Sequence, residues 1–352
     1  MKVGIIGLAR SGKTTVFNAL TGAHAAVGAF GAREANVAVI KVPDERVDRL
    51  AEIYGRDKKI YVEFEFVDIA PNESAAENKA LDDAALNFLK NVDALVHVVR
   101  VFHNENVVHP YGGVDPLRDC RALDEEIRLT DLIVIENRLE RLEKEHRRDN
   151  EFALLTRCKK HIEAGKPLRT LEHEPREKSD LAGFGFLSIK PLMLLGNYGE
   201  ADIGQDAPGG LAAYASENDL ATINLCGEME LEVAELPEED RKSFRDELGL
   251  GEESRRRFIQ TAFSMLGLIS FLTVGRAEVR AWAIPRGSTA HEAAGAVHTD
   301  MQRGFIRAEV VHYDQFVEAG SPAEAKTRGI VRLEGKDYVV QDGDIIQFRF
   351  NV

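Results

Sequence analysis

The sequence predicts an α/β protein in which a helical hairpin is inserted into a mostly parallel sheet and a separate β-rich domain follows. Three observations support this prediction. Continuous apolar runs, typical of buried parallel strands, occur at residues 3–6, 94–101 and 191–195. The charged stretch between the second and third runs has apolar residues at helical spacing. Towards the C-terminus a helix is predicted to end near Leu268, and Val279 opens a new, alternating strand.

Composition limits the classes of function. With 352 residues, 44% of them hydrophobic, the chain can fill more than one core, and we expect two or three domains. No run of about eighteen apolar residues occurs and the N-terminus opens directly into a strand, so we expect a cytosolic protein with no membrane partner. A net charge of −14 disfavours indiscriminate binding of DNA or RNA. Three widely spaced cysteines without a CxxC pair argue against disulfides and a zinc site.

The first strand, at residues 3–6, runs into the loop GLARSGKT, and a helix begins directly after it. The loop fits the pattern GxxxxGK[ST] in full. Glycine at both ends lets the backbone curl until successive N–H groups converge on a phosphate, and the helix N-terminus adds partial positive charge. We therefore predict a purine-nucleotide site formed by Gly7, Arg10, Ser11, Gly12, Lys13, Thr14 and Thr15.

Two side chains of this loop have distinct predicted roles. Lys13 is expected to reach the terminal phosphates, and Thr14 to ligate Mg²⁺ bridging the same oxygens. A second strand downstream alternates apolar and acidic residues and ends at Asp68, which is the natural second residue of the metal site. A lone Asp at a strand end is also a common turn cap, so that interpretation stays open.

The apolar run at 191–195 ends in the sequence GNYGE, residues 196–200. Side chains at the carboxyl ends of strands in an open α/β sheet meet the ligand. Asn197 and Glu200 are therefore predicted to read the base, and the carboxylate of Glu200 would accept a hydrogen bond from a purine amino group. Guanine-reading loops use the pattern Asn-Lys-x-Asp, and this chain lacks the lysine.

Two helices are predicted between the second and third apolar runs. The first spans Arg121 to Arg148 among dense charges, and the second ends at Gly165-Lys166-Pro167. A junction near residues 148–150 makes them an antiparallel hairpin. The hairpin is either a plain surface element that packs on itself or an arm that binds a partner.

Together these features resemble the YchF or Obg-like ATPase family, a branch of the translation-factor class of P-loop NTPases. The resemblance runs nearly end to end and includes NALTG after the phosphate loop, VPDERVDRLAEIY at 42–54 and HVVR at 97–100. It is closest at the C-terminus, where LEGKDYVVQDGDIIQFRFNV belongs to a block similar to a TGS domain, a small β-grasp module.

The resemblance implies a domain organisation and a function. The P-loop nucleotide domain is expected in residues 1–120 and 185–270, the inserted coiled-coil hairpin in 121–184 and the TGS-like domain in 276–352. The family favours ATP over GTP, so ATP or GTP with Mg²⁺ is the expected cofactor set. Ribosomes or other translation components are the implied partners, and we expect a monomer.

Two departures from the family pattern concern the terminal phosphate. Where the family's first switch has a threonine, this chain has Ala32, which offers no hydroxyl. In the second switch Pro71 replaces a glycine, and proline has no N–H to donate. We therefore predict slow or impaired hydrolysis. The family's proposed hydrolytic histidine corresponds to His109, although a lone loop histidine is ordinarily just exposed, and Arg10 stands where the family has Asn.

Two classes of function follow from the sequence. The chain is either a slow ATPase whose nucleotide state regulates contact with the translation machinery, or a hydrolysis-deficient nucleotide-binding adaptor or scaffold. The departures at Ala32 and Pro71 favour the adaptor, whereas the whole phosphate loop favours a bound nucleotide. A P-loop kinase for a small metabolite is disfavoured because no arginine-rich lid follows the sheet.

Overall fold

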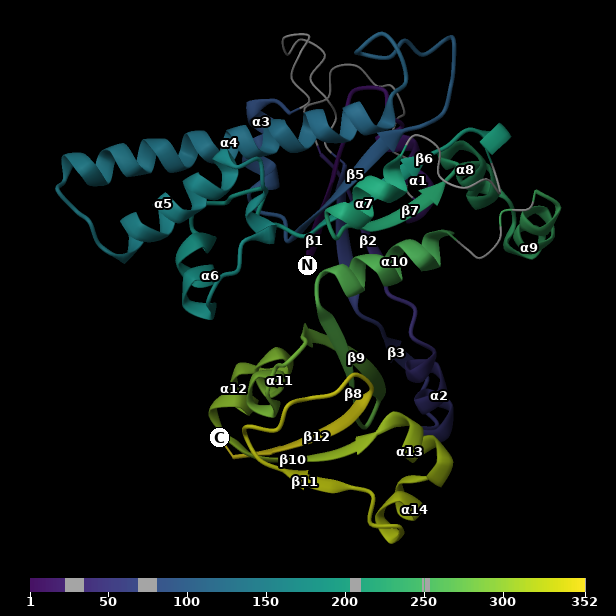
Figure 1. Ribbon diagram of the computed structural model, residues 1–352. Helices are drawn as coiled ribbons and strands as arrows, with labels where there is room; N and C mark the ends of the chain where they lie inside the picture. The colour runs from purple at the N-terminus through teal and green to yellow at the C-terminus, as the bar shows by residue number, and fades with distance from the viewer. Residues whose placement is uncertain (23–34, 69–80, 203–209, 249, 251–253, 352) are drawn as a thin grey trace. The chain divides into compact units, whose positions relative to one another are not determined.

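The computed structural model describes residues 1–22, 35–68, 81–202, 210–248, 250 and 254–351 (Figure 1). The chain forms two compact units, one of residues 1–39 and 65–258 and the other of 40–64 and 259–352. The sequence analysis placed residues 40–64 in the nucleotide domain. The contacts of these residues group them instead with the C-terminal unit. The domain boundaries stay a prediction. None of the helices in the described ranges is both long and apolar enough to cross a bilayer.

The first unit is built on a six-stranded sheet in the order β2-β4-β1-β5-β6-β7. The strands are β1 (Lys2–Ile6), β2 (Asn36–Lys41), β4 (Glu63–Asp68), β5 (Ala94–Arg100), β6 (Leu192–Asn197) and β7 (Ala221–Leu225). Pairing is parallel from β4 through β7. Every residue of β5 and β6 is buried, which explains their continuous apolar sequences. The predicted mostly parallel sheet is confirmed.

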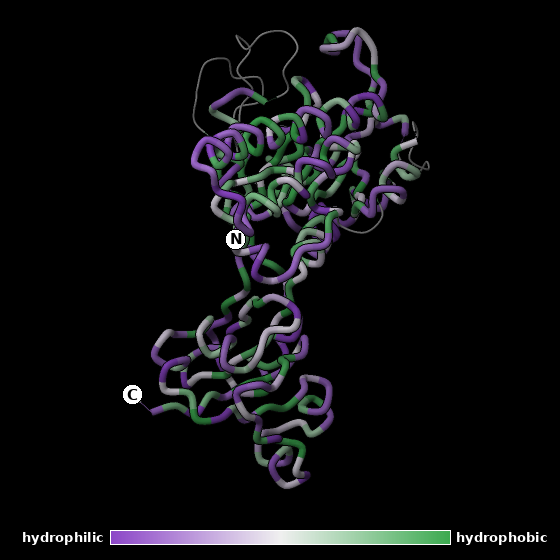
Figure 2. The backbone as a smooth tube through the Cα atoms, turned by 60° about the vertical axis from the view of Figure 1, so that its left-hand side comes forward, coloured by the Kyte–Doolittle hydropathy of each residue, from purple (hydrophilic) through white to green (hydrophobic). Residues whose placement is uncertain are grey.

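Helices cover both faces of this sheet. They include α1 (Lys13–Thr21), α3 (Asp83–Leu89), α4 (Pro116–Lys144), α7 (Leu211–Glu217) and α8 (Gly227–Glu235). Helix α9 (Glu238–Glu247) packs on α8, and α10 (Ser254–Met265) contains the boundary between the two units. Leu89 of α3 and Leu123 of α4 pack together with Ile6 and Leu95 on one face. Helix α1, which follows β1 directly, packs against α8. In Figure 2 hydrophobic residues gather along the strands inside the unit.

The order of the strands marks where a ligand binds. From β1 the chain continues through α1 towards β4 on one side, while β5 lies on the other side of β1. Open α/β sheets bind ligands outside the carboxyl ends of the strands where the order reverses in this way. The loop Gly7 to Gly12 follows β1 at that point.

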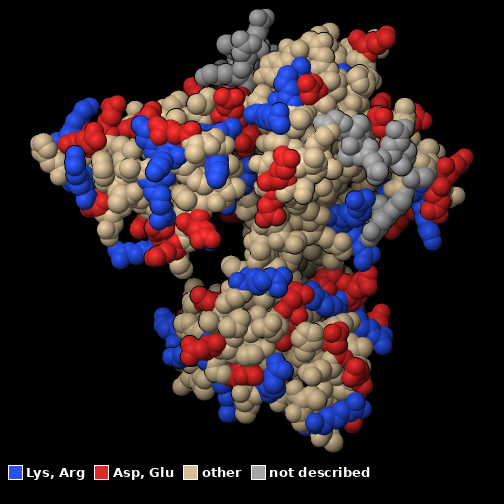
Figure 3. Space-filling model, in the orientation of Figure 1, with Lys and Arg blue, Asp and Glu red and all other residues tan. Residues whose placement is uncertain are grey.

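The inserted hairpin is formed by α4 and α5 (Asn150–Glu163), followed by a short 3₁₀ turn η1 (Leu168–Thr170) and α6 (Pro175–Ala182). Its apolar core includes Ile135 and Leu142 of α4 and Leu155 of α5. Lys, Arg, Asp and Glu are interspersed on its surface in Figure 3. Buried Asp131 of α4 accepts hydrogen bonds from the backbone N–H groups of Leu187 and Ser188, at 2.9 and 2.7 Å, which fixes α4 to the segment before β6. The predicted helical insertion is confirmed.

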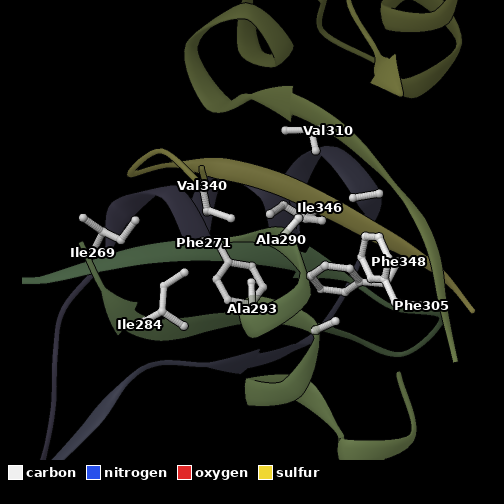
Figure 4. Packing of buried hydrophobic residues seen from close by; sticks show 12 residues of the cluster. Ile269, Phe271, Ile284, Ala290, Ala293, Phe305, Val310, Val340, Ile346 and Phe348 are labelled. Atoms are coloured by element: carbon white, nitrogen blue, oxygen red, sulfur yellow. The ribbon is translucent and has the colours of Figure 1, made fainter. Parts of the chain in front are cut away.

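The second unit contains a mixed sheet in the order β11-β10-β12-β8-β9-β3. Its strands are β3 (Lys58–Ile60), β8 (Leu268–Val274), β9 (Glu278–Pro285), β10 (Phe305–His312), β11 (Arg332–Glu334) and β12 (Asp344–Phe350). Its helices are α2 (Glu45–Tyr54), α11 (Ala290–Val297), α12 (Thr299–Arg303), α13 (Tyr313–Ala319) and α14 (Pro322–Thr327). Phe271, Phe305 and Phe348 pack against alanines of α11 in its core (Figure 4). This unit contains the β-rich C-terminal domain expected from the sequence.

Candidate functional site

The loop between β1 and α1 packs tightly against neighbouring strand ends. Gly7 and Gly12 have φ values of 152° and 86°, a region that side chains rarely adopt. A Cβ atom on Gly7 would collide with the carbonyl of Val98 in β5, and one on Gly12 would collide with the side chain of Asn197 in β6. Both glycines of the pattern are therefore required by conformation and by space.

Lys13 lies inside the curl of this loop. Its Nζ donates to the carbonyl oxygens of Gly7 and Leu8, at 2.9 and 2.8 Å. Burial lowers the pKa of its ammonium to about 8, and the nearby carboxylate of Asp68 partly opposes that shift. Thr15 is half-buried in the first turn of α1. The arrangement places one strongly desolvated cation where the loop would hold phosphates.

Thr14 and Asp68 meet at the carboxyl ends of adjacent strands, as the sequence predicts. The Thr14 hydroxyl donates to Oδ2 of Asp68 at 2.8 Å, and Nδ2 of Asn36 donates to the same oxygen at 3.3 Å. Asp68 is fully buried, and its Oδ1 has no hydrogen-bond partner within the described ranges. A buried carboxylate oxygen without a partner beside a hydroxyl fits the hard oxygen ligands that Mg²⁺ prefers. These two residues would hold the metal.

Asn36 was not among the predicted site residues. It stands at the start of β2, at the end of the stretch that corresponds to the family's first switch. Its amide contact with Asp68 could have been suspected only from the likeness of that stretch to the switch, because nothing in the spacing points to it. Ala32 and Pro71 lie outside the described residues, so the two departures stay predictions.

Asn197 connects the phosphate loop to α8. Its buried Nδ2 donates to the carbonyl oxygen of Ser11 at 3.0 Å, and its Oδ1 accepts from the backbone N–H of Gly227 at 3.0 Å. Ser11 is itself buried, and its hydroxyl lacks a hydrogen-bond partner among the described atoms. Glu200 is exposed and opens the 3₁₀ turn η2 (Glu200–Asp202) three residues later. The structure therefore brings Asn197 to the loop and leaves Glu200 at the open edge of the site.

Phe102 is a site residue that the sequence analysis missed. Its side chain lies 3.7 Å from where a Cβ atom on Gly12 would stand and 3.6 Å from the corresponding point on Gly199. The guanidinium carbon of Arg100 lies 4.4 Å from the centre of its ring. The ring of Phe102 therefore lies beside the phosphate loop, and its Cβ lies beside the loop after β6. The sequence could have indicated Phe102 only through its position, two residues after the end of β5.

His109 is buried rather than exposed, which contradicts the ordinary reading of a histidine in a Pro-Gly loop. Its Nε2 lies 2.8 Å from Oδ2 of Asp119, and its Nδ1 accepts from the backbone N–H of Tyr111 at 3.1 Å. Because Nδ1 accepts, we assign the ring proton to Nε2, which donates to Asp119. Arg118 donates through Nε and Nη2 to the other oxygen of Asp119. Both ring nitrogens therefore have hydrogen-bond partners within the protein.

A cavity of about 640 Å³ lies elsewhere in the first unit, against the C-terminal half of α1, and α8 and α9 line it. Arg245 of α9 and Glu230 of α8 form a paired contact there, with the shortest distance at 2.7 Å. None of the lining residues belongs to the phosphate loop. The cavity is distinct from the candidate nucleotide site.

Comparisons with known proteins give the family. Residues 2–138 match a family model described as "50S ribosome-binding GTPase", and residues 268–351 match the YchF C-terminal model, described as "Protein of unknown function (DUF933)". The chain is 38% identical over 364 residues to the "Ribosome-binding ATPase YchF" of Bacillus subtilis, with 100% of both chains covered. It belongs to the YchF family. The resemblance inferred from the motifs is confirmed.

Further members support the same assignment. The "Ribosome-binding ATPase YchF" of Escherichia coli O157:H7 is 37% identical over 361 residues, covering 100% of this chain and 99% of that protein. The solved structure titled "Structure of the Schizosaccharomyces pombe YchF GTPase" matches with a TM-score of 0.85 and 26% identity, covering 99% of this chain and 97% of that one. The parallel sheet, the helical insertion and the second, mixed sheet are therefore features of the YchF fold.

Proposed function

We propose that this chain is a purine-nucleotide-binding ATPase that prefers ATP over GTP, hydrolyses it slowly with Mg²⁺, and associates with ribosomes in the cytoplasm as a regulator of translation. The observation that carries the proposal is the convergence of Lys13, Thr14 and Asp68 at the carboxyl ends of β1 and β4. A buried cation, a hydroxyl and a buried carboxylate are the groups that bind a triphosphate and its metal.

The chain's own groups divide the work of binding. Backbone N–H groups of the loop and the N-terminus of α1 face the phosphates, and Lys13 adds a positive charge. Thr14 and Asp68 hold the metal, which when bound neutralises charge on the phosphate oxygens. Asn197 keeps the loop in place through Ser11 rather than contacting the phosphates itself.

The proposed preference for ATP rests on the end of the site near the loop after β6, where the base would lie. The ring of Phe102 lies beside Gly12 with the guanidinium of Arg100 over it, and a purine can stack on the part of the ring that Arg100 leaves free. The exposed carboxylate of Glu200 can accept a hydrogen bond from the adenine amino group and repels the guanine oxygen. Calorimetric titration with ATP, GTP and ADP, each with Mg²⁺, tests this directly. We expect ATP to bind more tightly than GTP, and the reverse order would refute the proposal.

Slow hydrolysis rests on missing contacts to the terminal phosphate. Phosphoryl transfer depends on positioning and charge stabilisation, and Ala32 and Pro71 remove one hydroxyl and one N–H. If each loss costs about 1.4–3 kcal/mol, each slows the reaction about ten- to a hundredfold. Single-turnover release of phosphate, repeated with Ala32→Thr combined with Pro71→Gly, should show a slow wild type and a faster double variant. A briskly active wild type would contradict the proposal.

The second candidate is an adaptor that binds nucleotide without hydrolysing it. The specific observation in its favour is that both ring nitrogens of His109 are engaged, by Asp119 and by the Tyr111 N–H. Phosphate release indistinguishable from the non-enzymatic rate, in both wild type and double variant, would favour this candidate.

Association with ribosomes rests on the relatives, which are named for it. Co-sedimentation of the chain with purified ribosomes, with ATP or ADP present, tests it. We expect more protein in the ribosomal pellet with ATP than with ADP. No ribosome-dependent pelleting in either state would remove this part of the proposal and leave nucleotide binding untouched.

A further inference from the structure

Arg10 has an unusual backbone conformation. Its φ is 62°, and only His146 and Asp219 share a positive φ among the non-glycine residues that the structure describes. The left-handed region is unfavourable for arginine, whereas glycine and asparagine adopt it more easily. A strained conformation of this kind persists where the surroundings fix it and is worth examining for function.

The side chain of Arg10 reaches another part of the site. Its Nη1 donates to the carbonyl oxygen of Val108, at 3.3 Å, across 98 positions of sequence. The guanidinium of Arg100 lies nearby and is itself held by the carbonyl oxygens of Phe102 and Asn104, at 3.2 and 3.3 Å. The two like charges repel each other, and the positive charge of Arg10 contributes to lowering the pKa of Arg100, after the larger effect of burial.

Val108 immediately precedes His109, so this contact acts on the segment that carries the histidine. Within the segment from Phe102 to Gly112, two adjacent residues are held by different partners: the Val108 carbonyl accepts from Arg10, and the His109 ring donates to Asp119. The side chain of Val108 itself is exposed, so the carbonyl is the group of this residue that the phosphate loop holds. The phosphate loop therefore holds the His109 segment directly, through one hydrogen bond.

We propose that Arg10 is a positioning residue for His109: it latches the segment against the phosphate loop, keeps the imidazole buried, and is drawn away by the phosphates of a bound nucleotide. A guanidinium binds anionic phosphate oxygens more strongly than a neutral carbonyl, so a triphosphate in the loop competes with Val108 for it. Release of the latch frees the segment and exposes His109. The first step of this proposal is that Arg10 keeps His109 buried, and it does not depend on nucleotide binding. The second step, release by the phosphates, rests on the proposed nucleotide binding.

The first step is tested on the full-length chain without nucleotide. Diethyl pyrocarbonate modifies accessible, neutral imidazole, and peptide mass spectrometry gives the rate at each histidine. We expect His109 to react about tenfold faster in Arg10→Asn than in wild type, the effect of losing one charge-assisted hydrogen bond. Exposed His103, on the same segment, is the internal control and should react equally fast in both proteins.

Two further variants separate the side chain from the backbone. Arg10→Gly removes the strain together with the guanidinium and should behave like Arg10→Asn, whereas Arg10→Lys keeps a donor and should restore much of the protection. Equal His109 rates in wild type, Arg10→Asn and Arg10→Gly would overturn the latch. Variants that melt no lower than wild type exclude general unfolding as the cause of faster reaction.

The second step is tested by adding ATP with Mg²⁺ at a concentration shown by calorimetry to saturate the site. We expect faster modification of His109 in wild type and no further increase in Arg10→Asn. Bound ATP that leaves the wild-type rate unchanged would overturn the release by phosphate. If calorimetry detects no nucleotide binding, the proposed function fails, and the comparison of variants without nucleotide still decides whether Arg10 is a latch.

Discussion

The two sides of the phosphate loop use their polar residues differently. On the metal side, Thr14 meets Asp68 at 2.8 Å and an oxygen of Asp68 has no hydrogen-bond partner among the described residues, so the groups are ready for a ligand. On the other side, Asn197 bonds Ser11 and Gly227, and both ring nitrogens of His109 are engaged. On one side a polar atom thus lacks a partner among the described residues, and on the other side the polar side chains are engaged with the protein itself.

The difference shows that a sequence motif assigns a residue's position reliably only where local structure alone fixes that position. Thr14 and Asp68 are placed by a strand-to-helix turn and a strand end, so their position follows from local structure. The roles of Asn197 and His109 depend on which partners tertiary packing supplies. Mutations on the two sides should therefore fail in different ways: on the metal side in ligand binding, and on the other side in stability.

The largest effect is expected for Lys13→Ala. Removing the buried cation should weaken binding of ATP with Mg²⁺ by about 1.5–3 kcal/mol, because charged hydrogen bonds to phosphate oxygens are lost. Calorimetric titration measures the change, and Lys2→Ala, at the exposed first residue of β1, is the matched control. Equal affinities of wild type and Lys13→Ala would show that this side does not serve a phosphate ligand.

Asn197→Ala should lower the free energy of unfolding by about 2 kcal/mol. The substitution leaves the carbonyl of Ser11 and the N–H of Gly227 without their partner in a buried region. Denaturant titration measures the loss, with exposed Asn224→Ala of β7 as the control. A variant as stable as wild type but unable to bind ATP would place Asn197 with the ligand-binding residues and erase the contrast drawn here.

The sequence predicted the features that depend on local patterns. The glycine spacing identified the loop, and the apolar runs identified the buried strands of the first sheet. The contacts of His109 could not be predicted, because Asp119 reaches it only through the position of α4. Phe102 was missed for a similar reason: its neighbours Gly12 and Gly199 come from two other strand ends.

The sequence also could not predict that residues 40–64 belong to the second unit. β3 contains three residues and pairs in parallel with β9, more than 200 positions away. Its burial pattern is mostly exposed, so no apolar alternation indicates which sheet it joins. Short edge strands are recruited by tertiary contacts rather than by their own pattern.

A smaller effect is expected from pH. Burial lowers the pKa of Lys13 to about 8, and phosphate oxygens would raise it again in the complex. Above pH 8 the free protein has a neutral Lys13, whereas the complex has a charged one, so binding must take up a proton. The affinity for ATP should therefore fall about tenfold between pH 7 and pH 9. Lys13→Arg stays charged throughout and should show no such fall. A wild-type affinity independent of pH over this range would mean that the ammonium does not contact the phosphates.

The smallest effect is expected for Glu200→Ala. Glu200 is exposed, so water competes for its carboxylate and the discrimination it provides should be about 1 kcal/mol or less, roughly a fivefold change in the ratio of ATP to GTP affinity. Competition binding with a fluorescent nucleotide measures that ratio, and the stability of the variant should match wild type. Asp202→Asn, in the same 3₁₀ turn, is the control for a disturbance of the turn itself, because Asp202 accepts from the Gly199 N–H at 3.4 Å. If Asp202→Asn changes the ratio as much as Glu200→Ala does, the shape of the turn selects the base, and Glu200 then belongs with Asn197 among the residues that serve architecture.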